Sequence, residues 1–361
     1  MLLPIVNSFN EWDPLEEVIV GVLEGTAELP WEKAYEACVK EEDIEKQRQF
    51  CLKHGGQPAI IDTGEYAIAQ KELNEFVYIL EAEGVKVRRP EPLNWAKPYS
   101  TPDWASMGGN AQSCPRDVLV VIGNEIIEAP MSWRSRYFEF LPYRKLIKEY
   151  FCQGAKWTAA PKPQMSEELY DQNYIRGYQR YVTTEFEPVF DAADIARCGK
   201  DIFVQRSHVT NEFGFKWLQQ HLGDNYNLHL LEFDDKEALH IDATFVPLAP
   251  GKLLINPDRP IKQMPDIFKK AGWDIFEAPR TTFPKTSHFY KYYEWLATIN
   301  VLMLDEQRVI VEKNEEQLIK ALKDWGFKPI PCAFRHCYRY GGSFHCFTCD
   351  IRRHGKLQSY F

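Results

Sequence analysis

The hydrophobic positions of this chain recur in a fixed order that predicts a strand, a tight turn, a strand, a helix and a strand. The clearest copy begins with Val118–Ile122, turns at Gly123-Asn124 and continues with Ile126-Ile127, which reads as a buried hairpin. A helix is predicted over 133–151 and a returning strand over 155–158. This segment therefore predicts one ββαβ unit.

The same unit recurs three times further along the chain. Its predicted hairpins span 194–205, 244–255 and 301–311, its helices 213–222, 265–271 and 315–325, and its returning strands 228–231, 273–276 and 329–331. Repeats of this kind are typical of propellers and solenoids, in which each copy buries its hydrophobic face against the next. The repeats therefore favour one cyclic domain, spanning residues 1–361, over two separate domains.

The two ends of the chain hold the parts of a fifth unit. A helix is predicted over 71–83, where apolar residues recur on one face, and a strand over 85–88 follows it. The opening strand at 17–20 has no hairpin partner nearby, because an insertion at 22–69 comes next. We expect the C-terminal segment 344–352 to pair with this strand and to close a ring of five units. The insertion is either a lid over a site or surface decoration.

Composition and charge narrow the class of protein. The chain has 361 residues, 45% of them hydrophobic, and a net charge of −9, without a run of Lys and Arg. It can bury a large core, and we expect no nucleic-acid partner. The start, Met1–Val6, is too short for a signal segment, and no apolar run approaches the length of a membrane span, so we expect no membrane partner. Nine scattered cysteines indicate reduced thiols in a cytoplasmic protein.

Four residues able to do chemistry lie at or just before the first strand of a predicted unit: Asp117, Asp191, His240 and Asp242. Equivalent positions of a ring meet near its axis, so these side chains should converge. Cys346 follows the glycine pair Gly341-Gly342, in what reads as the short buried strand that closes the ring. We therefore expect the thiol to join the same site.

Carboxylates, an imidazole and a thiol suit chemistry on the carbon of a guanidinium group. Carboxylates bind a planar cation bidentately and hold its carbon near a nucleophile. The bound cation and a nearby imidazolium lower the pKa of a thiol, and the thiolate is the nucleophile. An imidazole oriented by a carboxylate can protonate a leaving amine and later deprotonate an incoming one.

Each of these residues also has a purely structural interpretation. A lone cysteine in a strand such as Cys346 is commonly a small buried hydrophobe. Asp117 and Asp191 could be turn or capping residues, and His240 with Asp242 could line one face of a surface strand. The functional interpretation depends on their joint placement at equivalent positions of the units.

A metal site is a further alternative near the C-terminus. His345, Cys346 and Cys349 could form half a zinc site with His336-Cys337. The spacing differs from that of common zinc fingers and only one C-x₂-C pair exists, so we expect no metal.

Seven motifs spread along the chain carry a family resemblance. They are 10–21 (NEWDPLEEVIVG), 115–117 (PRD), 123–131 (GNEIIEAPM), 190–194 (FDAAD), 240–244 (HIDAT), 256–259 (NPDR) and 342–346 (GSFHC). From about residue 5 to Phe361 the sequence resembles the glycine and inosamine-phosphate amidinotransferases, which belong to the pentein superfamily of guanidino-group-modifying enzymes. The resemblance implies a five-bladed α/β propeller with pseudo-fivefold ββαβ repeats, in agreement with the ring above.

The resemblance also implies roles for the site residues. Cys346 would be the nucleophile that carries a covalent amidino group, and His240 the general acid and base, oriented by Asp191. The guanidinium grip would come from Asp117 and Asp242. In the family reaction arginine gives its amidino group to the cysteine, ornithine leaves, and an amine acceptor takes the group.

Two further expectations follow from the same resemblance. Arg259 matches the family position that binds the α-carboxylate of the arginine donor. No metal or organic cofactor is implied, and relatives of this kind are often homodimers.

The region that would bind the acceptor departs from the creatine-pathway branch. Tyr292-Tyr293 stand near the place of a serine pair, and Glu237 and Leu239 stand at the places of an Asn and a Met. The stretches 237–239 and 308–331 look closer to toxin-pathway members of the saxitoxin type. We expect the acceptor to be a natural-product intermediate or a small amino acid such as glycine or lysine, with Glu237 attracting a cationic one. A hydrolase of the deiminase or dihydrolase kind, and a silent binding homologue, stay open as alternatives.

Overall fold

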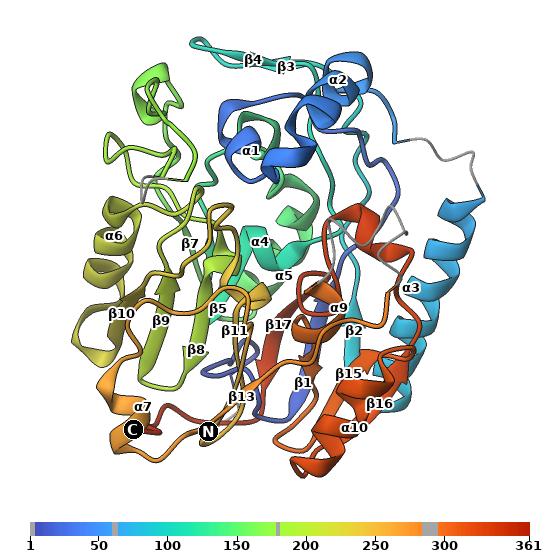
Figure 1. Ribbon diagram of the computed structural model, residues 1–361, viewed down its shortest axis with the longest axis vertical. Coiled ribbons are helices and arrows are strands. Elements are labelled where there is room, and N and C mark those ends of the chain that lie inside the picture. Colours follow the sequence, from blue (N-terminus) through green and yellow to red (C-terminus); the bar gives the residue numbers. More distant parts are fainter. Residues whose placement is uncertain (1–3, 60–63, 178–180, 284–294) are drawn as a thin grey trace.

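Five three-stranded sheets surround a central axis in the computed structural model (Figure 1). The structure describes residues 4–59, 64–177, 181–283 and 295–361. Each sheet is one blade, and in each blade an antiparallel hairpin is followed by a helix and a third strand that runs parallel to the second. The protein is a five-bladed α/β propeller, as the sequence predicted.

The second blade shows how the sequence builds the unit. Strand β5 (Leu119–Ile122) pairs antiparallel with β6 (Glu125–Glu128), and Gly123 at the turn has a φ of +63°, which favours glycine. Helix α5 (Arg144–Cys152) then crosses over, and β7 (Lys156–Ala159) lies parallel to β6.

The next three blades repeat this order. Their elements are β8 (Ile195–Cys198), β9 (Asp201–Gln205), α6 (Glu212–Leu222) and β10 (Asn227–Leu231); β11 (Phe245–Ala249), β12 (Lys252–Ile255), α7 (Asp266–Lys270) and β13 (Asp274–Glu277); and β14 (Leu302–Met303), β15 (Arg308–Glu312), α10 (Glu316–Asp324) and β16 (Lys328–Cys332). The predicted units therefore match the observed blades one for one.

The remaining blade joins the two ends of the chain. The C-terminal strand β17 (Thr348–Arg353) pairs antiparallel with β1 (Leu15–Val20), and β1 pairs parallel with β2 (Lys86–Arg88) after helix α3 (Glu65–Ala82). The prediction that the chain's end closes the ring is confirmed.

The insertion after β1 forms a layer of its own. It contains α1 (Lys33–Ala37), the 3-10 turn η1 (Glu41–Asp43) and α2 (Ile44–His54), and a small hairpin of β3 (Tyr99–Ser100) and β4 (Ala105–Ser106) follows beyond the first blade. Figure 1 shows α1 and α2 on the same side of the ring as the short helix α4 (Pro115–Val118).

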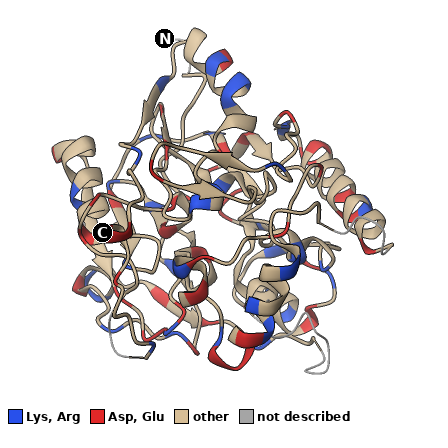
Figure 2. Cartoon of the chain, turned by 90° about the horizontal axis from the view of Figure 1, so that it is seen from above, with Lys and Arg blue, Asp and Glu red and all other residues tan. Residues whose placement is uncertain are grey.

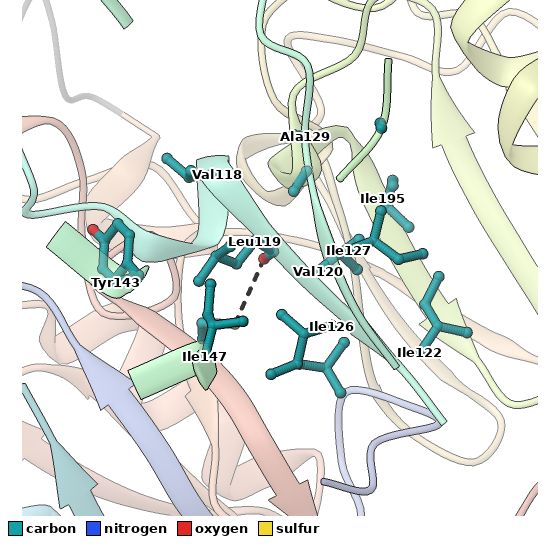
Figure 3. Packing of buried hydrophobic residues seen from close by; sticks show 14 of the residues in the cluster. Val118, Leu119, Val120, Ile122, Ile126, Ile127, Ala129, Tyr143, Ile147 and Ile195 are labelled. Atoms are coloured by element: carbon teal, nitrogen blue, oxygen red, sulfur yellow. Dashed lines mark hydrogen bonds between the residues drawn. The ribbon is translucent and has the colours of Figure 1, made fainter. Parts of the chain in front are cut away.

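Burial decreases from the axis outward. Every residue of the first strands β5, β8, β11 and β14 is buried, whereas the third strands β7, β10 and β13 are largely half-buried or exposed. Figure 3 shows the hydrophobic core around β5 and β6, where Ile126 and Ile127 lie among side chains that include Ile147 of α5 and Ile195 of the next blade. The strands that lead into the site are thus held in a rigid core.

Buried ion pairs fill the axis. Asp350 of β17 accepts hydrogen bonds from Arg116 and Arg353 at 2.8 Å each, and from Arg197 of β8 at 2.8 Å. Glu11 also binds Arg197, at 2.6 and 2.7 Å. Buried charges are stable only when they are paired in this way, so the axis ties the first, second and third blades together.

Three details of the sequence prediction are wrong. The segment 133–151 is helical only from residue 144, because the 3-10 turns η2 (Arg134–Arg136) and η3 (Leu141–Tyr143) precede α5 and Pro142 fits only a first helical turn. Cys346 lies in a turn just before β17 and not in a strand, and the helix predicted over 71–83 begins at Glu65.

Lys and Arg lie interspersed with Asp and Glu throughout the fold (Figure 2). None of the helices in the described ranges is long and apolar enough to cross a membrane.

Candidate active site

A short turn precedes the first strand of every blade, and these turns meet near the axis. They are α4, η5 (Ala192–Asp194), η7 (Ile241–Ala243), α9 (Leu296–Ile299) and the turn at 344–347. Contacts link α4 to η5, η5 to η7, and η7 to α9, while α4 also contacts β17. Residues far apart in the sequence are thereby brought together at one end of the propeller.

The thiol of Cys346 lies at the centre of this arrangement. Its side chain is 2% exposed, and Sγ donates to Oδ2 of Asp242 at 3.5 Å. Burial raises the pKa of the Cys346 thiol well above its usual value, and the negative charges of Asp242 and Asp117 raise it further. The free site therefore keeps the sulfur protonated.

The imidazole of His240 is held between two carboxylates. Its Nε2 lies 3.0 Å from Oδ2 of Asp191 and its Nδ1 lies 3.7 Å from Oδ1 of Asp117. Burial lowers the pKa of His240, but the charges of Asp117 and Asp191 outweigh burial and raise it to about 10. His240 is thus a cation at neutral pH. Its φ of +57° is rare outside glycine and is typical of functional sites.

Each of the three predicted carboxylates keeps one oxygen free. Within the described residues, Oδ1 of Asp117, Oδ1 of Asp191 and Oδ1 of Asp242 are buried and have no hydrogen-bond partner. A buried carboxylate oxygen without a donor is unfavourable. These three oxygens suit a cation that carries several N–H donors.

Arg136 belongs to the site, and the sequence analysis missed it. Its side chain is 7% exposed and donates to Asp117 at 2.9 Å and to Glu139 at 2.8 Å, and it lies 3.6 Å from Asp191. Arg136 offsets part of the negative charge and fixes the direction of two carboxylates. It lies in a region predicted as regular helix, where nothing distinguished it from the nearby Arg134.

Asn300 positions the nucleophile, and it was also missed. Its Oδ1 accepts from the backbone N–H groups of His345 and Cys346 at 3.1 Å each, and its Nδ2 donates to the Asp242 carbonyl at 3.3 Å. Asn300 lies just before the first strand of its blade, the same position as the other site residues. That equivalence was the signal that could have found it.

His345 connects the site to the axis. Its Nδ1 lies 2.8 Å from Oδ2 of Asp242 and its Nε2 lies 3.4 Å from Oε2 of Glu11. Burial acts to raise the pKa of Asp242, but the hydrogen bond and charge of His345 outweigh it and keep that pKa below its ordinary value. Asp242 is therefore an anion in the resting site.

Arg259 lies apart from the thiol and imidazole. Its Nε pairs with Oδ2 of Asp235 at 3.3 Å, and among the described residues neither Nη atom has a hydrogen-bond partner. The open fork of the guanidinium matches a carboxylate ligand. Asp235 itself lies on the loop that leads into His240.

Of the residues that we expect near the acceptor, the structure describes Glu237 and Leu239. Glu237 pairs with Arg176 at 3.0 Å, so its charge is compensated within the protein. Tyr292 and Tyr293 lie outside the described residues.

The insertion packs beside the site. Carboxylate oxygens of Glu32 accept from the backbone N–H groups of Arg134 and Ser135 at 2.7 and 2.8 Å, and Arg176 donates to the Glu36 carbonyl at 2.5 Å. Ala34 and Ala37 of α1 share a hydrophobic cluster with Trp133 and with Leu239, the residue before His240. The insertion is therefore attached to two loops that border the site.

The residues of the alternative zinc site point to separate partners. His345 binds Asp242, Cys349 donates to the Leu119 carbonyl, His336 binds Glu72, and Cys337 donates to the Ala69 carbonyl. Over the described ranges no group of three or more His, Cys, Asp or Glu side chains is arranged to hold a metal ion.

A propeller of five ββαβ blades with a thiol, an imidazolium and open carboxylates at its axis defines an enzyme of the guanidino-group-modifying class. Comparison with known proteins names the family. L-arginine:L-lysine amidinotransferase of Pseudomonas savastanoi pv. phaseolicola is 53% identical over 359 residues, which cover 98% of this chain and 96% of that protein. No family model matches the chain.

Solved structures agree. SxtG, an amidinotransferase of the saxitoxin biosynthetic pathway from Microseira wollei, is 53% identical with a TM-score of 0.94, over 99% of this chain and all of that one (100%). Inosamine-phosphate amidinotransferase of Streptomyces griseus is 36% identical with a TM-score of 0.86, over 98% of this chain and 99% of that one. The chain belongs to the amidinotransferase family, which confirms the resemblance read from its motifs.

Proposed function

We propose that the protein transfers the amidino group of L-arginine to an amine through a covalent intermediate on Cys346. The observation that carries the proposal is that, within the described part of the chain, Asp117, Asp191 and Asp242 each hold one buried oxygen without a hydrogen-bond partner, and Asp242 accepts from the Cys346 thiol. A guanidinium group supplies the positive charge and the N–H donors that these oxygens lack.

In the first half-reaction the bound guanidinium stabilises the thiolate of Cys346. Sulfur attacks the guanidinium carbon, and the bond from that carbon to the side-chain nitrogen of arginine breaks. The thiol proton passes to solvent when the thiolate forms, and the imidazolium of His240 protonates the leaving nitrogen and is left neutral. Ornithine leaves and an amidino group stays on sulfur.

In the second half-reaction an acceptor amine takes the place of ornithine. The neutral imidazole of His240 removes a proton from the attacking nitrogen, the new carbon–nitrogen bond forms, and the carbon–sulfur bond breaks to return the thiolate of Cys346. Asp191 fixes the direction of the imidazole throughout, because it lies 3.0 Å from Nε2.

The free fork of Arg259 suits the α-carboxylate of the donor. Relatives are named for lysine and for a toxin pathway, and we propose a primary amine of one of these two kinds as acceptor. Because Glu237 is paired with Arg176, it attracts a cationic acceptor only by exchanging that partner. Glu237→Gln should change the acceptor preference, measured as relative rates across a panel of amines; an unchanged preference removes Glu237 from acceptor recognition.

Intact mass spectrometry tests the covalent step. Protein incubated with arginine and no acceptor should gain about 42 Da, the mass expected for an amidino adduct on a covalent nucleophile, and release ornithine up to one equivalent. Cys346→Ala should show neither. Cys349→Ala is the matched control and should keep both, because its thiol donates to a carbonyl away from the carboxylates.

Products separate this proposal from its alternatives. Citrulline formed from arginine alone would show hydrolysis of the intermediate, as in a deiminase. Absence of adduct, ornithine and citrulline would leave only a binding role.

We further propose a cytoplasmic location and a homodimer. All nine cysteines are free thiols, which suits a reducing compartment. Light scattering on the purified chain tests the dimer.

A further inference from the structure

A second thiol, Cys114, lies beside Cys346. An ideal Cβ placed on Gly342 would lie 2.5 Å from Sγ of Cys346 and 3.9 Å from Sγ of Cys114, so both sulfurs border the same point. A Cβ on Gly341 would lie 3.0 Å from Sγ of Cys114. Because residues 341 and 342 are both glycine, no side chain from this pair separates the two thiols.

The backbone places the two cysteines side by side as well. The N–H of Arg116, two residues after Cys114, donates to the carbonyl of Cys346 at 3.4 Å. The thiol of Cys114 is 5% exposed, and its partners among the described residues are weak: the Tyr340 carbonyl and the Ser113 hydroxyl, each at 3.8 Å. It makes no contact that the transfer reaction uses.

We propose that Cys114 is a resolving thiol, which forms a reversible disulfide with Cys346 when a peroxide oxidises the nucleophile. A site that admits the side chain of arginine also admits hydrogen peroxide. A reactive thiol that has no second thiol nearby is oxidised irreversibly beyond the sulfenic acid. A neighbouring thiol can instead react with the sulfenic acid and form a disulfide.

The chemistry balances in two steps. Sulfur of Cys346 attacks one peroxide oxygen, the O–O bond breaks, and a sulfenic acid and water form. The thiol of Cys114 then attacks that sulfur, the S–O bond breaks, and a second water leaves with the thiol proton. Two thiols are oxidised by two electrons and one peroxide is reduced, and an added dithiol reverses the change by exchange.

Cys349 is the alternative partner, because it forms the C-x₂-C pair with Cys346. Its Sγ donates to the Leu119 carbonyl of β5 at 3.5 Å, and its strand position faces Ile19 of β1. Its thiol is thus held toward the neighbouring blade rather than toward the glycine pair.

Peroxide treatment of the full-length protein, followed by denaturing mass analysis and peptide mapping, tests the proposal. The wild type should lose about 2 Da, the two hydrogens of a disulfide, yield a cross-linked peptide pair holding Cys114 and Cys346, and regain activity with a dithiol. Cys114→Ser and Cys114→Ala should instead gain oxygen on Cys346, with at least tenfold less activity regained. Cys349→Ala should behave as the wild type does.

A cross-link from Cys346 to Cys349, or equal recovery in wild type and both Cys114 variants, would overturn the proposal. The cross-linked peptide is read from the wild type alone, so a variant that fails to fold leaves the test intact. Preincubation with arginine should block the cross-link by occupying sulfur. If the cross-link forms and arginine gives no protection, the resolving role of Cys114 stands and the amidino intermediate fails.

Discussion

Replacing Asp242 by Asn should have opposite effects on the free thiol and on turnover. Asp242 accepts from Sγ of Cys346 at 3.5 Å, and its charge raises the pKa of that thiol. The same residue presents a free oxygen that we assign to the guanidinium. The variant should therefore have a more reactive thiol without arginine and almost no transfer with it.

The size of the effect follows from the distance. Two unit charges about 4 Å apart interact by about 4 kcal/mol at an effective dielectric constant of about 20, and a change of one in pKa corresponds to about 1.4 kcal/mol. The hydrogen bond of His345 with Oδ2 of Asp242, at 2.8 Å, already offsets part of this repulsion. We expect Asp242→Asn to lower the pKa of Cys346 and so to speed its alkylation about tenfold or more at a given pH.

The assay is the rate of alkylation of Cys346 by iodoacetamide as a function of pH, measured by peptide mass. The neutral reagent reports the thiolate fraction without interacting with the site charges. The buried Cys349 is an internal control for loosened packing, and its peptide should stay unmodified in both proteins. Equal or slower alkylation of the variant across the whole pH range would refute the electrostatic reasoning.

Three further outcomes are expected. Arg259→Lys replaces a fork by a point charge and should raise KM for arginine about tenfold with a smaller change in kcat, while Arg308→Lys, at a surface pair, should leave the steady-state kinetics unchanged. Asn300→Ala leaves two buried N–H groups unpaired and should lower the free energy of unfolding in urea by about 2 to 5 kcal/mol, together with kcat; an unchanged urea midpoint would contradict its role. Asp350→Asn should cost about 3 to 5 kcal/mol. Burial acts to raise the pKa of Asp350, but three arginines hold it far below its ordinary value of 3.8. Its stabilisation of the fold is therefore complete above pH 3.8 and is lost as the pH falls. The free energy of unfolding of the variant should depend less on pH in acid, and an identical acid profile would contradict this role of Asp350.

The ring could be predicted from sequence because each blade carries its own evidence. Hairpins with buried first strands and amphipathic helices such as 316–324 are local patterns, and their repetition fixes the topology without long-range information. The closure by β17 needed only the observation that 17–20 had no hairpin partner. Where local pattern was ambiguous, at 133–151, the prediction was wrong, since aromatic and apolar residues pack there in turns rather than on one helix face.

The chemistry of the site was harder to predict, because it depends on contacts between turns of different blades. Asp117, Asp191, His240 and Asp242 were found by their equivalent positions, and the structure brings them together. Arg136 was not predicted, because it follows the hairpin of its blade instead of preceding the first strand. The position of Asn300 is equivalent, but an uncharged amide in a buried turn carries no sign of the two N–H groups that it binds.

The resting charges of the site explain how a deeply buried thiol can be both safe and reactive. In the free protein the carboxylates keep Cys346 mostly protonated, so little thiolate is present, and they keep His240 positively charged. A bound guanidinium neutralises those carboxylates, and the same change lowers the pKa of the thiol and of the imidazole together. Nucleophile and proton donor are thus activated by one event, the arrival of the cation. A neutral molecule of the same shape does not cause that change, so the charge of a guanidinium substrate, as well as its fit, speeds its attack by Cys346.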